Sequence, residues 1–319
     1  MPDSTVVITG ATSGLGLHTA RRLAQRGWHV VMGHRDAARG AAAAEDVRRR
    51  VPGARVEAMH IDLAALRSVS RAVELLRDGG APRPPLRAIV ANGAVQVVDG
   101  VRTSADGYEL TFATNHLGHH HLVTSLLDHL GPAARVVVVS SGTHWGPERA
   151  LGFPGPRWRD PVELADPRRA DASATAGRVR YATSKLANLL FVRELARRSA
   201  GRRIAANAFD PGLMPGTALA RDYAPAARAA YRLLAPAVAA LVPGAGTARR
   251  SSATLADMVD SRRFEGVTGA YVAGRTLAES SPLSHSADEA RLLWEASRAL
   301  VERALAGAGP ALDGAPTGA

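Results

Sequence analysis

Two side chains placed four residues apart, Tyr181 and Lys185, could carry acid–base chemistry. They stand in "YATSKLANLLF", and Lys185 is the only lysine among 40 Lys and Arg residues. On a helix the two positions share one face, about 6 Å apart along the axis. A nearby ammonium favours the phenolate and so lowers the pKa of a phenol from its usual value near ~10. The pair predicts a proton-exchanging tyrosine, and an exposed, structural lysine is the competing interpretation.

A glycine-rich turn, "TGATSGLG" (9–16), follows the first apolar run of the chain. Gly10 permits a tight turn, Gly14 permits the close approach of a phosphate, and Gly16 permits close packing of a following helix. That helix would direct its N-terminus at a pyrophosphate. The turn therefore predicts a dinucleotide site. A plain strand–helix turn remains the alternative, because a glycine pattern alone is a weak signal.

The second apolar run ends in "GHRD" (33–36), where the adenine ribose of a dinucleotide would lie. An acidic residue at this point would bind the 2′-hydroxyl of NAD. His34 and Arg35 instead offer positive charge, and arginine suits a 2′-phosphate. Asp36 is expected to cap the next helix. These residues favour NADP(H) over NAD(H).

Short apolar runs alternate with helical patterns from the first residues, which predicts an α/β fold with a doubly wound parallel sheet. The Val run in "RVVVVSS" is typical of a strand that is buried on both faces. The predicted strands are 5–9, 29–33, 55–61, 86–92, 135–141, 203–209 and 269–273. The predicted helices are 15–26, 37–50, 65–77, 105–130 and 180–199.

Three segments fall outside this alternation. Residues 142–179 are rich in Pro, Gly, Asp and Arg and carry three aromatic residues, which suggests a lid over a substrate pocket. Residues 213–258 are rich in Ala and Pro and suggest an insertion above the sheet. The tail 306–319 is of low complexity and is expected to be disordered. We therefore expect one domain over 1–305 with two lid insertions.

Composition excludes several classes of function. The chain has no cysteine, which rules out disulfides and thiolate chemistry and suits a reducing cytoplasm. The N-terminus lacks a signal-peptide pattern, and the most apolar segment, 229–242, is too short to span a bilayer. The net charge of +11 comes from scattered arginines, so nucleic acid is not an expected partner. His116, His119 and His120 have a spacing that could hold a metal, but no carboxylate accompanies them, so no metal is expected.

The motifs "TGATSGLG", "ANGA", "TNHLG", "VVSS", "YATSK" and "DPG" together resemble the short-chain dehydrogenase/reductase family over about residues 4–300. The branch that it resembles most contains retinol dehydrogenases and protochlorophyllide reductases. The resemblance implies one Rossmann domain whose seven strands have the order 3-2-1-4-5-6-7. It also implies an NADP(H)-dependent enzyme with a small-molecule substrate, assembled as a homodimer or homotetramer.

The resemblance assigns roles to matched residues. Tyr181 would be the general acid or base, and Lys185 would bind the nicotinamide ribose and lower the pKa of Tyr181. Ser141, with Ser140 as the neighbouring candidate, would hydrogen-bond the substrate oxygen, and Asn115 would hold the proton relay. The expected cofactor-binding residues are Gly10, Thr12, Ser13, Gly14, Leu15, Gly16, Arg35, Asp62, Leu63, Asn92, Tyr181, Lys185, Pro211, Gly212 and Thr217.

Two departures from the family pattern accompany these roles. The family's Asn-Ala-Gly is Asn92-Gly93-Ala94 here, and Ala94 is expected to weaken cofactor binding. Ser141 and Tyr181 are separated by a long aromatic-bearing segment. Hydride transfer to a carbonyl or from an alcohol of a bulky, lipophilic substrate is the leading interpretation. Reduction of a C=C bond and a non-catalytic NADP-binding sensor or scaffold are the alternatives. The light-driven reductases of that branch use a cysteine, which this chain lacks.

Overall fold

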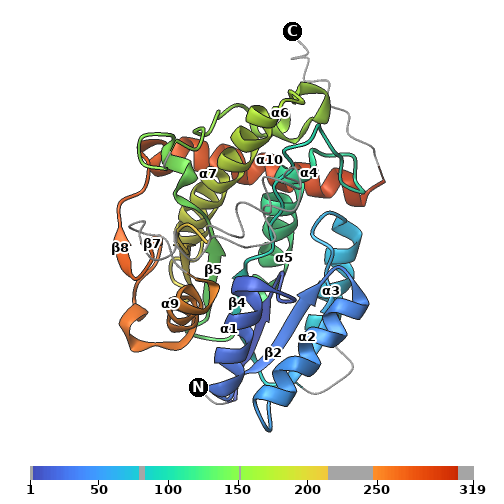
Figure 1. Ribbon diagram of the computed structural model, residues 1–319, viewed down its shortest axis with the longest axis vertical. Coiled ribbons are helices and arrows are strands. Elements are labelled where there is room, and N and C mark those ends of the chain that lie inside the picture. The colour runs from blue at the N-terminus through green and yellow to red at the C-terminus, as the bar shows by residue number, and fades with distance from the viewer. Residues whose placement is uncertain (1–2, 79–82, 151, 215–246, 308–319) are drawn as a thin grey trace.

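One eight-stranded sheet forms the centre of the protein (Figure 1). The computed structural model describes residues 3–78, 83–150, 152–214 and 247–307. The strand order is β3-β2-β1-β4-β5-β6-β7-β8, so the predicted order of seven strands is confirmed. The strands are β1 (Thr5–Ile8), β2 (His29–His34), β3 (Val56–His60), β4 (Leu86–Ala91), β5 (Arg135–Val139), β6 (Ala205–Asp210), β7 (Tyr271–Ala273) and β8 (Thr276–Ala278).

The eighth strand was not predicted. It pairs antiparallel with β7, whereas the other neighbours in the sheet are parallel. All three residues of β8 are exposed, so this short edge strand lacks the buried apolar run that marks the other strands.

Helices cover both faces of the sheet. On one face α1, α2 and α9 pack over side chains such as Val6 and Ile8. On the other face α3, α5 and α7 pack over side chains such as Val7 and Ile89, with α10 outside them. The long helices are α1 (Gly14–Gln25), α2 (Ala37–Arg50), α3 (Leu66–Asp78), α5 (Gly118–Leu126), α7 (Ala174–Arg198), α9 (Ala248–Asp260) and α10 (Ala287–Leu305). Burial of central strands such as β1 and β5 on both faces explains the continuous Val runs in the sequence.

The predicted helix over 105–130 is wrong at its start and in its continuity. It begins with α4 (Leu110–Phe112), because the Glu109 carboxylate accepts a hydrogen bond of 2.7 Å from the Phe112 amide and caps the first turn. A π-helical turn, η1 (Ala113–Leu117), then separates α4 from α5. Such turns occur often at functional sites. Asn115 lies at the centre of this one.

The segment 142–179 is more regular than the predicted loop. It contains the 3₁₀ turn η3 (Gly142–Trp145) and α6 (Pro161–Ala165). The helix that carries Tyr181 and Lys185 begins at Ala174 rather than near 180, because the Ser173 hydroxyl accepts a hydrogen bond from the Ala176 amide and caps it. Most of the expected insertion over 213–258, and most of the expected disordered tail, lies outside the described residues.

The C-terminal helix α10 was not predicted, and it packs across α7 (Figure 1). Trp294 of α10 stacks on Phe191 of α7, with their ring centroids 5.7 Å apart. The Tyr108 hydroxyl donates a hydrogen bond of 2.8 Å to the Leu300 carbonyl. Helix α10 therefore packs directly against α7. The expected assembly as a homodimer or homotetramer stays a prediction. No helix within the described ranges is long and apolar enough to cross a membrane.

Candidate active site

A cavity of about 1020 Å³ opens at the carboxyl ends of the parallel strands. This is where open α/β sheets bind their ligands, because the strand order reverses there between β1 and β4. The cavity brings together most of the residues that the sequence singled out. Those lining it are Gly10, Thr12, Ser13, Gly14, Leu15, Arg35, Asp62, Leu63, Asn92, Ser141, Tyr181, Lys185, Pro211 and Gly212.

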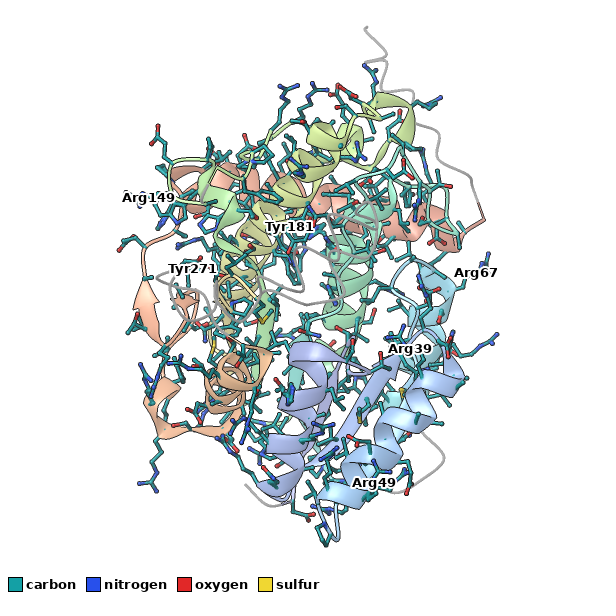
Figure 2. The ribbon with its side chains drawn as sticks, viewed as in Figure 1. Arg39, Arg49, Arg67, Arg149, Tyr181 and Tyr271 are labelled. Atoms are coloured by element: carbon teal, nitrogen blue, oxygen red, sulfur yellow. The ribbon has the colours of Figure 1, made fainter. Side chains whose placement is uncertain are left out.

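The side chains of Tyr181 and Lys185 meet on one face of α7. The Lys185 ammonium lies 5.4 Å from the centroid of the Tyr181 ring and donates a hydrogen bond of 3.0 Å to the Val139 carbonyl at the end of β5. Lys185 is only 2% exposed, and burial lowers its pKa to about 8. Figure 2 shows Tyr181 near the middle of the molecule in this view. The pair thus places a positive charge beside a phenol inside the site.

The two serines after β5 have different surroundings. The Ser140 hydroxyl is buried and donates a hydrogen bond of 2.8 Å to the Lys185 carbonyl, which fixes α7 against the strand. The Ser141 hydroxyl is half-buried, lines the cavity and accepts a longer contact of 3.4 Å from the Thr143 amide. Ser141 is therefore the serine whose hydroxyl is better placed to meet a ligand.

A buried carboxylate, Asp210, ends β6 at the same cavity. One of its oxygens accepts a hydrogen bond of 2.8 Å from the Tyr271 hydroxyl, and the other accepts one of 2.9 Å from the Gly212 amide. Figure 2 shows Tyr271 on β7, to one side of Tyr181. The charge of Asp210 raises the pKa of Lys185 and so opposes the effect of burial. Asp210 therefore favours the ammonium form of Lys185.

The glycine turn has the shape that a pyrophosphate requires. Gly10 has φ +63°, and a Cβ there would lie 2.8 Å from the Gly93 Cα. A Cβ at Gly16 would lie 2.5 Å from the Gly10 carbonyl oxygen, so only glycine fits. Gly14 has φ +52° with open space beside it. Because the Ser13 side chain makes no capping hydrogen bond, the first amides of α1 remain available to an anion. These residues fit a bound dinucleotide.

Two arginines stand at the ribose end of the cavity. Arg35 and Arg39 are exposed and line it, and neither guanidinium has a recorded partner within the part of the chain that the structure describes. The Asp36 carboxylate instead accepts a hydrogen bond of 2.9 Å from the Arg39 amide, so its predicted capping role is confirmed. Arg39 was not predicted as a site residue; it lies in the first turn of α2, four residues after Arg35. This end of the cavity carries positive charge.

The wall between β1 and β4 is held by Thr9. Its hydroxyl oxygen accepts hydrogen bonds of 2.9 Å from the amides of Asn92 and Gly93. Gly93 stands at the closest approach to Gly10, and a Cβ at Gly93 would lie 2.7 Å from Leu63 Cδ1. Gly93 is thus close to Gly10, with only the end of the Leu63 side chain in the way of a Cβ, and Ala94 lies beside it on the cavity wall.

Asn115 is fully buried and lies behind the cavity wall rather than on it. Its side chain pairs with the Val95 backbone through hydrogen bonds of 2.8 and 3.0 Å, and it donates a third bond of 2.9 Å to the Ser184 hydroxyl. Ser184 in turn donates a hydrogen bond of 2.7 Å to the Tyr181 carbonyl. The predicted residue Gly16 likewise packs behind the wall. Thr217 lies outside the described residues.

The histidines of the central helices point to separate partners. His116 bonds the Ser297 hydroxyl, His119 bonds Thr9, and His121 bonds Ser70, each at 2.8 Å. Within the described ranges no group of three or more His, Cys, Asp or Glu side chains is placed to hold a metal ion.

A doubly wound sheet with a glycine turn after β1 and a Tyr–Lys pair facing the same cavity defines a dinucleotide-binding α/β protein. The family described as short chain dehydrogenase matches residues 4–148. Human retinol dehydrogenase 13 is 31% identical over 305 residues, covering 94% of this chain and 85% of that protein. The chain therefore belongs to the short-chain dehydrogenase/reductase family, a family of oxidoreductases, and falls with its retinol dehydrogenase branch.

Other relatives extend the comparison. The human WW domain-containing oxidoreductase is 34% identical over 302 residues, covering 94% of this chain and 68% of that protein. The polyprenol dehydrogenase of Danio rerio is 32% identical, covering 92% and 86% of the two chains. A solved structure from Mycobacterium Paratuberculosis has 32% identity and a TM-score of 0.66, with 93% of each chain covered.

Proposed function

We propose that this chain is an NADP(H)-dependent oxidoreductase that moves a hydride between the nicotinamide and a carbonyl or alcohol carbon. The observation that carries the proposal is one cavity lined both by the glycine turn and by Ser141, Tyr181 and Lys185. The turn can hold a dinucleotide, and the three side chains can hold and protonate an oxygen beside it.

The ribose end of the cavity supports NADP(H) over NAD(H). Arg35 and Arg39 offer two guanidinium groups at the end of β2, and guanidinium forks match phosphate oxygens well. Asp36 also lines the cavity, but one of its carboxylate oxygens is already engaged by the capping hydrogen bond from the Arg39 amide. The charge at this end therefore favours a 2′-phosphate.

At the end of the cavity away from the two arginines, different residues have different roles in proton transfer. The bound nicotinamide would supply or accept the hydride. The Tyr181 phenol donates a proton to the substrate oxygen in reduction and removes one in oxidation. Lys185, kept charged with the help of Asp210, stabilises the phenolate that remains. Ser141 hydrogen-bonds the substrate oxygen, while Ser140 and Asn115 keep α7 in position.

Several apolar side chains line the cavity on the side of Tyr181. Phe153 faces Tyr181, with the two ring centroids 6.1 Å apart and the rings edge to face. Pro154, Leu213 and Met214 line the same region. Because Phe153 and Pro154 belong to the segment between Ser141 and α7, this segment would act as the substrate lid. A lipophilic carbonyl or alcohol fits such walls, and the names of the retinol and polyprenol dehydrogenase relatives agree with it.

Tyr181→Phe tests the proposal. Purified protein would be incubated with NADPH and a panel of ketones, aldehydes and quinones, and NADPH oxidation would be followed by absorbance. The variant should lose at least about 100-fold in kcat, because it lacks the transferable proton, while its Kd for NADPH stays within twofold. Turnover by Tyr181→Phe at the wild-type rate would contradict the proposed chemistry. If the wild-type protein binds NADPH but turns over no substrate, a non-catalytic sensor is favoured.

A further inference from the structure

One histidine of α5, His119, is bonded at both ring nitrogens to elements on opposite sides of the active site. Its Nδ1 lies 3.1 Å from the Asn115 carbonyl oxygen, one helical turn earlier. Its Nε2 lies 2.8 Å from the Thr9 hydroxyl at the end of β1. His119 is 1% exposed, so both bonds are shielded from water. Its burial and its two specific bonds set it apart from a surface histidine.

The chemistry of the partners fixes which atoms donate. A carbonyl only accepts, so Nδ1 carries the proton and donates to Asn115. A neutral imidazole then has an acceptor at Nε2, and the Thr9 hydroxyl donates to it at 2.8 Å rather than to the Val90 carbonyl, which lies 3.4 Å away. The same Thr9 oxygen accepts from the amides of Asn92 and Gly93, at 2.9 Å each. Every hydrogen-bonding group of His119 and Thr9 is thereby used.

These bonds form part of a longer chain across the site. From the amides of Asn92 and Gly93 the chain passes through Thr9 and His119 to the backbone of Asn115. The Asn115 side chain continues it through the Ser184 hydroxyl to the Tyr181 carbonyl. The wall beside the glycine turn is therefore connected to the helix of the catalytic tyrosine.

The backbone around His119 leaves little freedom for this link to shift. A Cβ at Gly118 would lie 2.4 Å from the Leu63 carbonyl oxygen, so α5 runs in direct backbone contact with the chain after β3. Asn115 lies within the π-helical turn, where the Gly118 amide bonds back to the Ala113 carbonyl. A side chain that anchors the Asn115 carbonyl would hold this irregular turn in one conformation.

We propose that His119 is a positioning residue that joins the cofactor wall at Thr9 to the π turn of Asn115, an inference that rests on the proposed function. Its Nε2 side maintains the wall beside the glycine turn, against which the dinucleotide would bind. Its Nδ1 side maintains the turn from which Asn115 holds α7. Loss of the first bond therefore weakens cofactor binding, and loss of the second lowers turnover.

Two substitutions separate the two bonds. His119→Gln keeps a polar group near the Nε2 position, where it can bond Thr9, but has no donor at the Nδ1 position. His119→Asn keeps a donor near the Nδ1 position and cannot reach Thr9. We expect His119→Gln to hold the Kd for NADPH within twofold and to lose about tenfold in kcat. We expect His119→Asn to raise this Kd about fivefold and to keep kcat within threefold at saturating NADPH.

His121 of the same helix supplies the matched control. It is also bonded at both ring nitrogens, to Ser70 and Ser125, but on the side of α5 away from the cavity. His121→Gln and His121→Asn should change neither Kd nor kcat by more than twofold. Thr9→Val, which removes the bond to His119 together with the acceptor of the Asn92 and Gly93 amides, should raise the Kd for NADPH at least as much as His119→Asn does. If a His119 variant fails to fold, Thr9→Val still tests whether the wall at Thr9 supports NADPH binding.

The outcome is read from the Kd for NADPH, measured by fluorescence titration, together with kcat and Tm. A split between the two His119 variants in Kd and kcat supports the positioning role. Equal losses in both variants that merely follow a lower Tm would overturn it. Tyr181→Phe in the same series reports on the proposed function alone, because its phenol is not part of this chain of bonds. If no carbonyl is turned over, the Kd values alone decide, and equal Kd values for the two His119 variants reject the inference.

Discussion

The ammonium of Lys185 lies 5.4 Å from the centroid of the Tyr181 ring while bonding the Val139 carbonyl at the end of β5. One contact directs the charge toward the phenol, and the other fixes it to the sheet. The chain uses arginine for its other 39 basic side chains. A planar guanidinium is larger than an ammonium and presents its donors in a fixed fork. The buried space beside Tyr181 therefore explains why the chain has a lysine at this position.

Lys185→Arg should cost at least about 100-fold in kcat, although it keeps the positive charge. The guanidinium would need to displace the contacts around Val139, and its charge would be spread over a larger group. Stopped-flow or steady-state NADPH oxidation measures the loss of kcat. Thermal unfolding followed by circular dichroism gives the Tm and verifies that the variant is folded. Turnover near the wild-type rate would show that charge alone is sufficient at this position.

Asp210→Asn should move the alkaline limb of the pH profile of kcat/KM to lower pH. Burial lowers the pKa of Lys185 to about 8, and the Asp210 carboxylate partly opposes this shift. Without that charge the pKa of Lys185 falls further, so the ammonium is lost at a lower pH. Tyr271→Phe is the control, because it removes the hydroxyl bonded to Asp210 and keeps the carboxylate. An unmoved limb in Asp210→Asn would reject the electrostatic role.

Local patterns predicted the elements, because each depends on neighbours in the sequence. The Val run of β5 indicates a strand that is buried on two faces. The four-residue spacing places Tyr181 and Lys185 on one face of any helix that contains both. The capping role of Asp36 is also local, and it is confirmed by the hydrogen bond from the Arg39 amide. The glycine turn and the Tyr–Lys pair could therefore be inferred from the residues alone, whereas the strand order came from the family resemblance and was confirmed by the structure.

Contacts between distant segments could not be predicted in this way. His119 and Thr9 are 110 residues apart in the sequence, and Tyr271 and Asp210 are 61 apart. Asp210 belongs to the motif "DPG", but the sequence did not indicate that its charge would raise the pKa of Lys185. The π turn at Asn115 was not predicted, because such single turns within a helix are rare and are not part of the regular apolar spacing that predicts helices. These features depend on the packing of the whole fold.

His120→Phe should stabilise the protein, with a gain that grows as pH falls. Both ring nitrogens of His120 are buried without a hydrogen-bond partner in the described structure, and the ring packs against Phe191 and Trp294. Burial lowers the pKa of His120 to about 3. Between pH 6.5 and pH 3 the unfolded chain binds a proton that the folded chain excludes, so stability falls as pH falls.

The variant removes this proton linkage. Its free energy of unfolding should exceed that of the wild type by about 1 kcal/mol at pH 7 and by roughly 3 kcal/mol at pH 5. Urea unfolding at both pH values measures the difference. His116→Phe is the comparison, because His116 bonds the Ser297 hydroxyl at 2.8 Å, and its removal leaves that buried hydroxyl without this partner. An equal gain at pH 7 from both variants would contradict the argument.

Phe153→Ala should raise the KM for a lipophilic substrate about tenfold and leave the Kd for NADPH within twofold. The Phe153 ring stands edge to face with Tyr181 on the substrate side of the cavity, so its loss removes apolar contact area from the substrate alone. Trp158→Phe is the matched control. Trp158 lies in the same segment, but its indole bonds Glu289 of α10 and it does not line the cavity. An unchanged KM in Phe153→Ala would show that the segment is not a substrate lid.

Arg35→Ala and Arg39→Ala should each raise the KM for NADPH about tenfold and leave the KM for NADH within twofold. Both guanidinium groups line the ribose end of the cavity, and only NADPH carries the 2′-phosphate that they would bind. Arg49→Ala is the control, because Arg49 lies at the opposite end of α2 from Arg39 (Figure 2) and pairs with Asp46. Steady-state rates with each cofactor at a fixed substrate concentration give the ratio. Equal losses with NADPH and NADH would mean that the two arginines do not read the 2′-phosphate, and the preference for NADP(H) would then be wrong.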